Sequence, residues 1–354
     1  MVRALARVDV GAIERNCARL AAAVAPARLC AVVKADGYGH GAVPAARAAQ
    51  AGGAAWLAVA TAAEAAELRS AAIEGPLLVM GALSDKELET ALRARADVVA
   101  WREEFVGKLG ADARVHVKLD AGMGRLGTRD PDEASRVAAA AGDRLAGLMT
   151  HFATADEDDQ SFVDEQLARF RDWIPRHPSV PVHAANSAAA LRRPDARFDM
   201  VRCGIAVYGM DPFHRDPADH GLEPALELVS YVAEVKRCEA GESAGYGRRF
   251  VAERPTWLGT IPIGYGDGVR RALTNNAEAL VDGRRVPLVG TVSMDNITVD
   301  LGDDPPPRGS EAVLIGARGG ERILAEELAA RLGTINYEIT CGITARVPRD
   351  HIAR

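Results

Sequence analysis

Eight apolar runs of strand length recur in the first part of the chain and constrain its fold more than any other feature. The stretches between them carry Ala, Glu, Arg and Leu at helical spacing, as in segments 61–72 and 132–142. Strands that alternate with helices pair in parallel, and eight such units within about 220 residues favour a (β/α)8 TIM barrel over an open sheet. The runs lie at residues 29–36, 55–61, 75–83, 96–101, 114–122, 145–153, 181–189 and 200–209.

The pattern changes after about residue 222. Strand-like runs continue, but the helical spacers shrink and Gly and Asp-Gly turn signals appear, so residues 280–290 read as a hairpin. A helix is expected within 321–333 and a final strand within 340–352. We therefore expect an α/β chain of two domains, a barrel over 1–222 preceded by a helix, and a mostly β domain over 223–354.

Composition excludes several classes of function. The formal net charge is -6 and the basic residues are scattered, which argues against a nucleic-acid surface. The five cysteines are far apart without a C-x-x-C pair, and the eight histidines lack H-x-x-x-H spacing, so we expect neither a disulfide framework nor a metal site. No apolar run is long enough to span a bilayer and no signal-peptide core is visible, so a cytoplasmic location is expected.

Unusual polar residues lie at the carboxyl ends of the predicted strands, where barrel enzymes place their active sites. Lys34 alone could extend its amine to solvent, or be desolvated and act as a nucleophile or base. Stability does not explain why polar groups follow five different strands. These groups are Lys34, Lys118 with Asp120 and Arg125, His151, Asn186 with Ser187, and Arg202.

Ordered sequence blocks across nearly the whole chain resemble those of the alanine racemases. The segment "AVVKADGYGHG" (31–41) is similar to the family's pyridoxal-phosphate attachment motif. The other blocks, in the family's order, are "VHVKLDAGMGRLG", "THFATADE", "HAANSAA", "MVRCGIAVYG", "GTIPIGYGDG", "VSMDN" and "INYEITCGITARVPR". The resemblance implies a homodimeric, cytoplasmic enzyme that uses pyridoxal 5'-phosphate to interconvert L- and D-alanine and supplies D-alanine for peptidoglycan.

The resemblance also implies how the cofactor is held. Lys34 would bond to the cofactor aldehyde, and Arg202 would face the pyridine nitrogen, which stays unprotonated because arginine does not release its proton. The structural alternatives are an ion pair for Arg202, a helix N-cap for Ser187 and a turn for Gly204. The remaining cofactor contacts would come from Tyr38, Asn186, Ser187, Gly204, Ile205 and Tyr337.

Racemisation by this family implies two bases on opposite faces of Cα. Lys34 would work on the D-side proton and Tyr246 on the L-side proton. His151 would hydrogen-bond Tyr246, touch Arg202 and lower the pKa of the tyrosine. Plain structural roles for Tyr246 and His151, on a strand and at a strand end, remain the alternatives. Tyr246 would act in the partner subunit's site, so activity would need a dimer.

Further residues would bind the substrate. Arg125 would reach its carboxylate, and Lys118 would carry a carbamate that fixes this arginine, since two adjacent cations are costly. Met294, Asp295 and Tyr265 would line the site from the second domain, although packing and turns are their alternatives. Tyr337 and Tyr246 would narrow the entrance and favour alanine.

Two positions depart from the family pattern, and two other functions stay open. Thr291 stands where arginine is frequent and Ser293 where cysteine is frequent, which leaves side-chain selectivity less certain. A broader amino-acid (serine) racemase is one alternative, because pockets reject one added hydroxyl weakly. A non-catalytic pyridoxal-phosphate carrier protein is the other, although carriers resemble the barrel part alone. A related decarboxylase would need an acid in place of Arg202.

Overall fold

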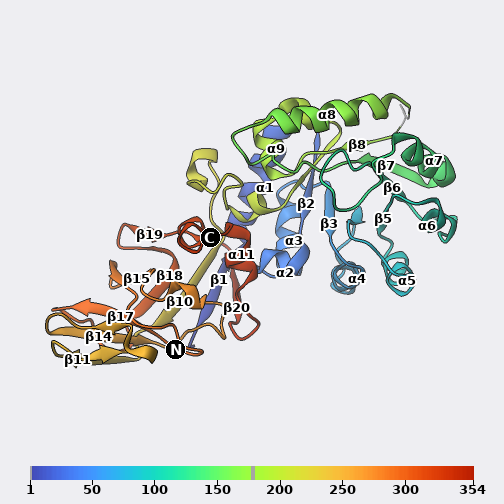
Figure 1. Cartoon of the computed structure of the whole chain (residues 1–354). Coiled ribbons are helices and arrows are strands. Elements are labelled where there is room, and N and C mark those ends of the chain that lie inside the picture. The colour runs from blue at the N-terminus through green and yellow to red at the C-terminus, as the bar shows by residue number, and fades with distance from the viewer. Residues whose placement is uncertain (1, 177–179) are drawn as a thin grey trace. The chain divides into compact units, whose positions relative to one another are not determined.

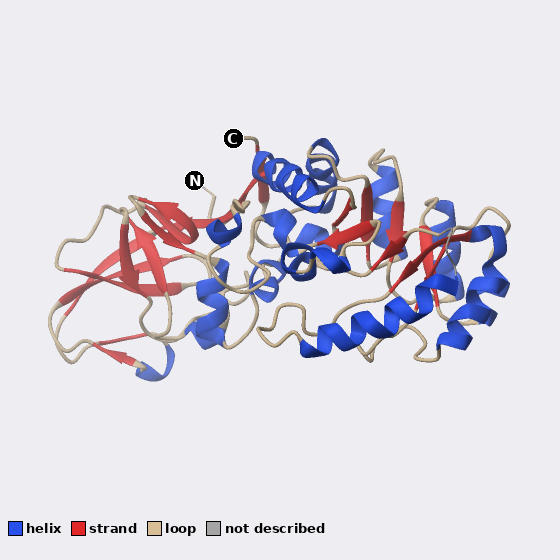
Figure 2. Cartoon of the chain, turned by 90° about the horizontal axis from the view of Figure 1, so that it is seen from above, coloured by secondary structure: helices blue, strands red, loops and turns tan. Residues whose placement is uncertain are grey.

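The computed structural model describes residues 2–176 and 180–354, and the chain divides into two compact units. The barrel unit is Ile13–Phe213. The C-terminal unit combines the first residues, up to Ala12, with His214–Arg354. Figure 2 shows that the two units differ in secondary structure: helices flank the barrel strands, and strands dominate the C-terminal unit.

The eight predicted runs form a closed parallel barrel (Figure 1), which confirms the predicted fold. Most of these strands are buried on both faces, as expected for a parallel sheet that helices cover, and this explains their continuous apolar character. The strands are β2 (Arg28–Val32), β3 (Trp56–Val59), β4 (Leu77–Val79), β5 (Asp97–Ala100), β6 (Val115–Lys118), β7 (Leu145–Met149), β8 (Val182–His183) and β9 (Met200–Cys203).

Helices connect the barrel strands. Helix α4 (Ala62–Ser70) shows how one of them begins, because Thr61 and Glu64 form a reciprocal capping box at its first turn. The predicted leading helix is α1 (Val10–Val24). The other helices of the barrel unit are the short α2 (Lys34–Tyr38), α3 (Ala42–Ala51), α4 (Ala62–Ser70), α5 (Asp85–Arg93), α6 (Glu103–Gly107), α7 (Pro131–Ala141), α8 (Ser161–Trp173) and α9 (Ser187–Arg192).

In the described residues, the C-terminal unit contains three sheets, two α-helices and three short 3-10 helices. Its largest sheet has the order β16-β15-β18-β10-β1-β20, with β19 paired to β18, and includes the predicted hairpin as β15 and β16. The bounds are β1 (Leu5–Asp9), β10 (Leu226–Tyr231), β15 (Glu278–Val281), β16 (Arg284–Pro287), β18 (Glu311–Arg318), β19 (Glu321–Ile323) and β20 (Arg349–Ile352). The predicted helix is α10 (Ala325–Leu332), followed by α11 (Asn336–Cys341).

Two smaller sheets complete this unit. A three-stranded sheet has the order β11-β14-β17, and β12 pairs with β13. The strands are β11 (Glu234–Cys238), β12 (Ser243–Ala244), β13 (Phe250–Val251), β14 (Thr256–Ile261) and β17 (Ile297–Gly302).

The division of the chain differs from the boundary expected at residue 222. Strand β1 lies between β10 and β20 in the large C-terminal sheet, pairing antiparallel with one and parallel with the other. These backbone hydrogen bonds assign the first twelve residues to the C-terminal unit, and that unit resumes at His214. The physical reason is long-range pairing, which a local reading of residues 5–9 does not reveal.

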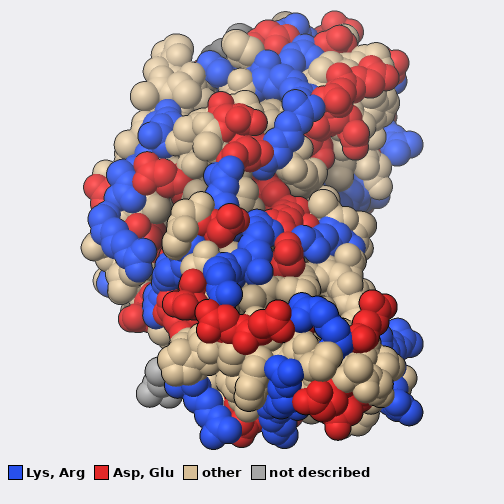
Figure 3. Space-filling view, turned by 90° about the vertical axis from the view of Figure 1, so that its left-hand side faces the viewer, with Lys and Arg blue, Asp and Glu red and all other residues tan. Residues whose placement is uncertain are grey.

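The surface and the thiols add little that is specialised. On the face shown in Figure 3, basic and acidic side chains are interspersed. All five cysteines are free thiols, and four of them are buried. Among the residues that the structure describes, no helix combines the length and hydropathy that a bilayer crossing requires.

Candidate active site at the carboxyl ends of the barrel strands

Lys34 follows the end of β2 and begins a strained turn. Residues 35–38 all have positive φ, from 52° to 59°, including the non-glycine residues Ala35, Asp36 and Tyr38. L-residues in this region cost free energy, so neighbouring groups must hold the turn. The amide of Ala35 donates to Oε1 of Glu64 at 2.7 Å, and the amide of Ala42 donates to Oδ1 of Asp36 at 2.9 Å. The backbone that carries Lys34 is therefore held by helix α4 and by its own loop.

The predicted strand-end cations converge on His151. Burial and the charge of Arg202 hold the pKa of His151 well below its usual value, and the charges of Lys118, Arg125 and Lys34 add to this effect. The imidazole is therefore neutral at physiological pH. Four cations that come from different parts of the sequence thus lower the pKa of the same side chain.

Arg202 projects from β9 into a set of neutral acceptors. Its NH2 group donates to the carbonyl oxygens of Thr150 at 2.8 Å and Ala184 at 3.0 Å, and it lies 3.2 Å from Nδ1 of His151. NH1 lies 2.7 Å from Nδ1 of His183. Burial lowers the pKa of Arg202 to about 10, so the guanidinium keeps its charge at neutral pH.

Lys118 ends β6 and is almost completely buried, with 4% of its surface exposed. Burial lowers the pKa of its amine to about 8, and the charges of Arg202 and Arg125 contribute to this shift. The nearby carboxylate of Asp120 opposes the shift but is engaged elsewhere. It accepts hydrogen bonds from the amides of Gly122 and Gly124 and so shapes the loop that carries Arg125.

Two hydroxyl groups meet at the backbone of Gly204. A β-carbon on this residue would lie 2.2 Å from Oη of Tyr38, so only glycine leaves room for the tyrosine. On the other side, Oγ of Ser187 accepts a hydrogen bond from the amide of Gly204 at 3.0 Å. Ile205 follows in a short 3-10 helix. Hydroxyl groups and backbone amides of this kind are suitable donors for an anion such as a phosphate.

The N-cap of α9, the helix after β8, is Asn186 and not Ser187. The side chain of Asn186 accepts from the amide of Ala189 at 3.0 Å and is the N-cap of α9. The N-cap interpretation of Ser187 is therefore wrong. Its hydroxyl is turned to Gly204 because Asn186, one position earlier, already supplies the cap.

The site residues expected from the C-terminal part lie together within that unit. Three loops are joined by hydrogen bonds from the amide of Tyr265 to Ser293 O, from the amide of Gly266 to Met294 O, and from Oγ1 of Thr291 to Tyr246 O at 2.6 Å. The large apolar side chains on these loops are unusually exposed, at 72% for Tyr246, 52% for Met294 and 41% for Tyr265.

Two other predicted residues of this unit have local partners. Asp295 accepts from NH2 of Arg346 at 2.6 Å. Tyr337 is half-buried in α11, and its ring lies edge-on to His214 with 6.4 Å between ring centroids. The structure thus joins the loops of Tyr246, Tyr265 and Met294, whereas Tyr337 packs against His214.

Sequence reasoning missed a buried polar chain in the barrel. Asp97, His116 and His183 connect to Arg202 by short side-chain contacts. A signal for one member was present, because His116 lies two positions before Lys118 and a strand of period two places both on the same face. The apolar context of these strands hides the other members.

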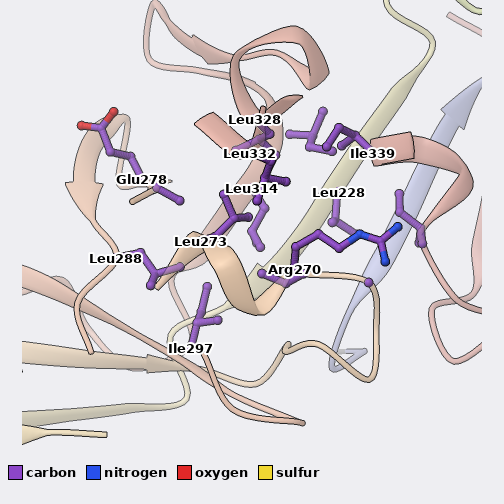
Figure 4. A pocket seen from close by; sticks show the side chains of 15 residues that line it. Leu228, Arg270, Leu273, Glu278, Leu288, Ile297, Leu314, Leu328, Leu332 and Ile339 are labelled. Atoms are coloured by element: carbon purple, nitrogen blue, oxygen red, sulfur yellow. The ribbon is translucent and has the colours of Figure 1, made fainter. Parts of the chain in front are cut away.

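A small apolar cavity in the C-terminal unit does not resemble an active site (Figure 4). Its volume is about 30 Å³, and leucine and isoleucine side chains such as Leu273, Leu314 and Ile339 line it. This is room for one or two water molecules and far too small for a cofactor. The chemistry-bearing groups of the barrel unit lie at the strand ends instead.

Comparison with known proteins identifies both parts of the chain. The family model described as "Alanine racemase, N-terminal domain" matches residues 8–212, and "Alanine racemase, C-terminal domain" matches residues 225–351. An alanine racemase of Frankia casuarinae is 41% identical and covers 99% of this chain and 97% of its own length. An alanine racemase of Thermobifida fusca is 44% identical over 97% of this chain and 96% of its own length.

Solved structures agree with these sequences. The alanine racemase from D-cycloserine producing Streptomyces lavendulae superposes with a TM-score of 0.94 at 37% identity, covering 100% of this chain and 98% of that one. The alanine racemase of E. faecalis superposes with a TM-score of 0.93 at 36% identity, covering 99% and 98%.

Proposed function

The chain belongs to the alanine racemase family, and from this premise we propose that it interconverts L- and D-alanine with pyridoxal 5'-phosphate as cofactor. The observation that carries the proposal is the arrangement at the strand ends, where NH2 of Arg202 lies 3.2 Å from Nδ1 of His151 and the charges of Arg202, Lys118, Arg125 and Lys34 all lower the pKa of that imidazole. Such a group of cationic side chains suits an anionic cofactor and an amino-acid carboxylate. Both family domains are present, which favours the enzyme over a carrier protein.

The residues present fit the cofactor. Lys34 offers a primary amine for the aldehyde, and the hydroxyl of Tyr38, which packs against the backbone of Gly204, would contact the phosphate. Tyr38, Ser187 and the amides after β9 would hold the phosphate, with Asn186 fixing the start of α9 beside them and Tyr337 adding a hydroxyl. The bound cofactor would withdraw electrons from Cα of the substrate and so stabilise the negative charge that proton removal creates there.

Arg202 would face the ring nitrogen as a hydrogen-bond donor. A guanidinium with a pKa of about 10 donates a hydrogen bond without transferring its proton at neutral pH. The ring nitrogen would stay unprotonated, and the charge at Cα would be short-lived. This favours prompt return of a proton over side reactions.

Lys34 and Tyr246 would move the proton on opposite faces of Cα. His151 would assist the tyrosine, because its Nδ1 faces the guanidinium of Arg202 and must accept, which leaves its proton on Nε2. That Nε2–H would hydrogen-bond the tyrosine oxygen and stabilise its ionised form. A tyrosine that is 72% exposed on a face with Tyr265 and Met294 supports a second copy of the chain as its partner. We therefore propose a homodimer with shared active sites.

The buried amine of Lys118 is suited to carbamate formation. Carbon dioxide reacts with the unprotonated amine, the new C–N bond forms and one proton is released to solvent. A pKa of about 8 makes the unprotonated form far more abundant at neutral pH than in an ordinary lysine. The product is an anion between Arg202 and Arg125, where it would relieve the repulsion and fix Arg125 toward the substrate carboxylate.

Selectivity for alanine would depend on the C-terminal loops. Tyr246 and Tyr337 would narrow the entrance, and Met294 and Asp295 would border the substrate carboxylate together with Tyr265. Thr291, where the family often has arginine, holds the backbone of Tyr246 through its hydroxyl. Serine differs from alanine by one hydroxyl, so weak serine turnover remains compatible with this site.

The compartment and the product follow from the same proposal. Four buried free thiols suit a reducing cytoplasm. In a bacterium the D-alanine produced would supply peptidoglycan synthesis.

Chiral analysis of L-alanine after incubation with the purified protein and pyridoxal phosphate tests the proposal. We expect both enantiomers to appear, and Lys34→Ala and Tyr246→Phe to lose most of the activity. Untouched L-alanine with cofactor bound through Lys34 would show that the substrate is wrong, and L-serine and larger amino acids would be tried next. The matched control is Tyr231→Phe, a tyrosine on β10 outside the proposed site.

A further inference from the structure

A chain of buried polar side chains crosses the interior of the barrel and ends on Arg202. NH1 of Arg202 lies 2.7 Å from Nδ1 of His183, and Nε2 of His183 lies 2.8 Å from Nδ1 of His116. Nε2 of His116 lies 3.1 Å from Oδ2 of Asp97. Asp97 is the first residue of β5 and Arg202 the third of β9, so the chain runs from the amino ends of the strands toward the site.

The groups at its two ends fix the direction of every hydrogen bond. A guanidinium can only donate, and a carboxylate can only accept. Nδ1 of His183 must therefore accept from Arg202, and its proton lies on Nε2 and is donated to His116. The proton of His116 then lies on Nε2 and is donated to Asp97. An imidazolium at either position would place two donors face to face, so this is the one arrangement that satisfies all three contacts.

The residues around His116 leave room for this series of hydrogen-bonded side chains. Gly147 on β7 is paired in register with His116, and a β-carbon there would lie 2.3 Å from Nδ1 of the imidazole. The ring of Trp56 packs edge-on against His116 with 5.6 Å between centroids. Burial and the charge of Arg202 also hold the pKa of His183 well below its usual value, in agreement with a neutral ring.

We propose that Asp97 is a positioning residue for Arg202: by accepting the last hydrogen bond of the chain, it holds His116 and His183 as Nε2–H tautomers. His183 then presents a lone pair to the guanidinium. If these hydrogen bonds ran in the opposite direction, Nδ1–H of His183 would point at Arg202. It would then displace the guanidinium from the carbonyl oxygens of Thr150 and Ala184. The effect on racemisation rests on the proposed function, whereas the direction of the chain does not.

The tautomers can be measured directly. The full-length protein with bound pyridoxal phosphate is labelled with ring-15N histidine, and long-range 1H–15N spectra are assigned with His116→Gln and His183→Gln. We expect both rings to carry a single proton, on Nε2. An imidazolium or an Nδ1–H tautomer at either position in the unsubstituted protein would overturn the proposal, whether or not any variant folds.

Variants of Asp97 separate positioning from a purely structural role. Asp97→Leu removes the acceptor, and we expect Nδ1–H signal at His183 and a fall in kcat of about tenfold or more. Asp97→Asn keeps an acceptor oxygen and should restore the tautomers and most of kcat. The control Arg114→Ala removes the exposed partner that reaches the same Oδ2 at 3.2 Å and should change neither. Unchanged tautomers in Asp97→Leu would refute the proposal, whereas absent racemase activity with the expected spectra would refute only the proposed function.

Discussion

The hydroxyl of Tyr38 occupies the space where residue 204 would carry a β-carbon, 2.2 Å from the ideal position of that atom. Tyr38 can therefore keep this position only while residue 204 is glycine.

Gly204→Ala should weaken cofactor binding by at least about tenfold, because Tyr38 must leave the position from which it would contact the phosphate. Titration of the apoprotein with pyridoxal phosphate, followed by its absorbance, measures the change. Gly107→Ala is the control, since a β-carbon there would have no neighbour within 4 Å. Equal affinities of the two variants would contradict the assignment of this pocket to the phosphate.

Carbamate formation at Lys118 should be visible by 13C NMR with 13C-enriched bicarbonate. The carbamate signal should fall as the pH drops below about 8, because protonation of the amine competes with carbon dioxide for the same lone pair. Lys118→Met should abolish the signal. A signal that persists in this variant would come from another amine and would refute the assignment.

In buffer free of carbon dioxide, Lys118 should make stability depend on pH. The unfolded chain keeps the lysine proton up to the ordinary lysine pKa of 10.5, whereas the folded protein releases it at a pKa of about 8. Unfolding therefore takes up a proton between these values, and stability should rise with pH across this window. Below pH 8 the buried ammonium costs roughly 3 kcal/mol, which Lys118→Met should recover. The exposed Lys108, substituted in the same way, should change the free energy of unfolding by less than about 1 kcal/mol in urea titrations.

Glu64 should be needed for cofactor attachment although it lies outside the predicted site. Its carboxylate accepts from the amide of Ala35 at 2.7 Å and from those of Ala60 and Thr61, so it holds the strained turn after Lys34 as well as the start of α4. Glu64→Ala should cost about 1–3 kcal/mol of stability and slow attachment of the cofactor to Lys34. Thermal unfolding and absorbance changes on reconstitution measure both. If the exposed Glu67 on the same helix gives the same losses when truncated, the effect is not specific to the turn.

Mixing two inactive variants tests the shared active site. A hybrid dimer of Lys34→Ala and Tyr246→Phe chains would contain one site with both native residues and one site with neither. After complete subunit exchange we expect about a quarter of the native activity. A mixture that stays inactive while hybrid dimers are shown by mass spectrometry would mean that Tyr246 acts within its own chain.

The barrel could be predicted from the sequence because each of its strands is a continuous apolar run, and burial on both faces leaves that signal intact. The strand-end residues Lys34, Lys118 and His151 stood out because a charged or polar group is unusual at the end of such a run. The ordered sequence blocks, through their resemblance to the family, indicated which role each of these residues would have. Asp97 escaped notice because a carboxylate at the start of a strand has the appearance of an ordinary surface residue.

Strand β1 could not be predicted for a different reason. Its buried and half-buried residues alternate over only five positions, and its partners β10 and β20 lie far along the chain. Pairing over such distances depends on the whole sheet and is not encoded in the local sequence. The local sequence also left the direction of the hydrogen-bond chain from Arg202 to Asp97 open, since this depends on which rings meet in space.

The position of β1 has a consequence for the order of events during synthesis on the ribosome. Ala6 pairs with Leu228 of β10 and with Arg349 of β20, so β1 cannot complete its pairing until both of these later strands have been made. The barrel strands, all encoded between β1 and β10, are free to assemble in the meantime, because domains fold as their residues emerge. Strand β1 must therefore wait unpaired until β10 emerges, and it keeps one open edge, which chaperones could protect, until β20 follows.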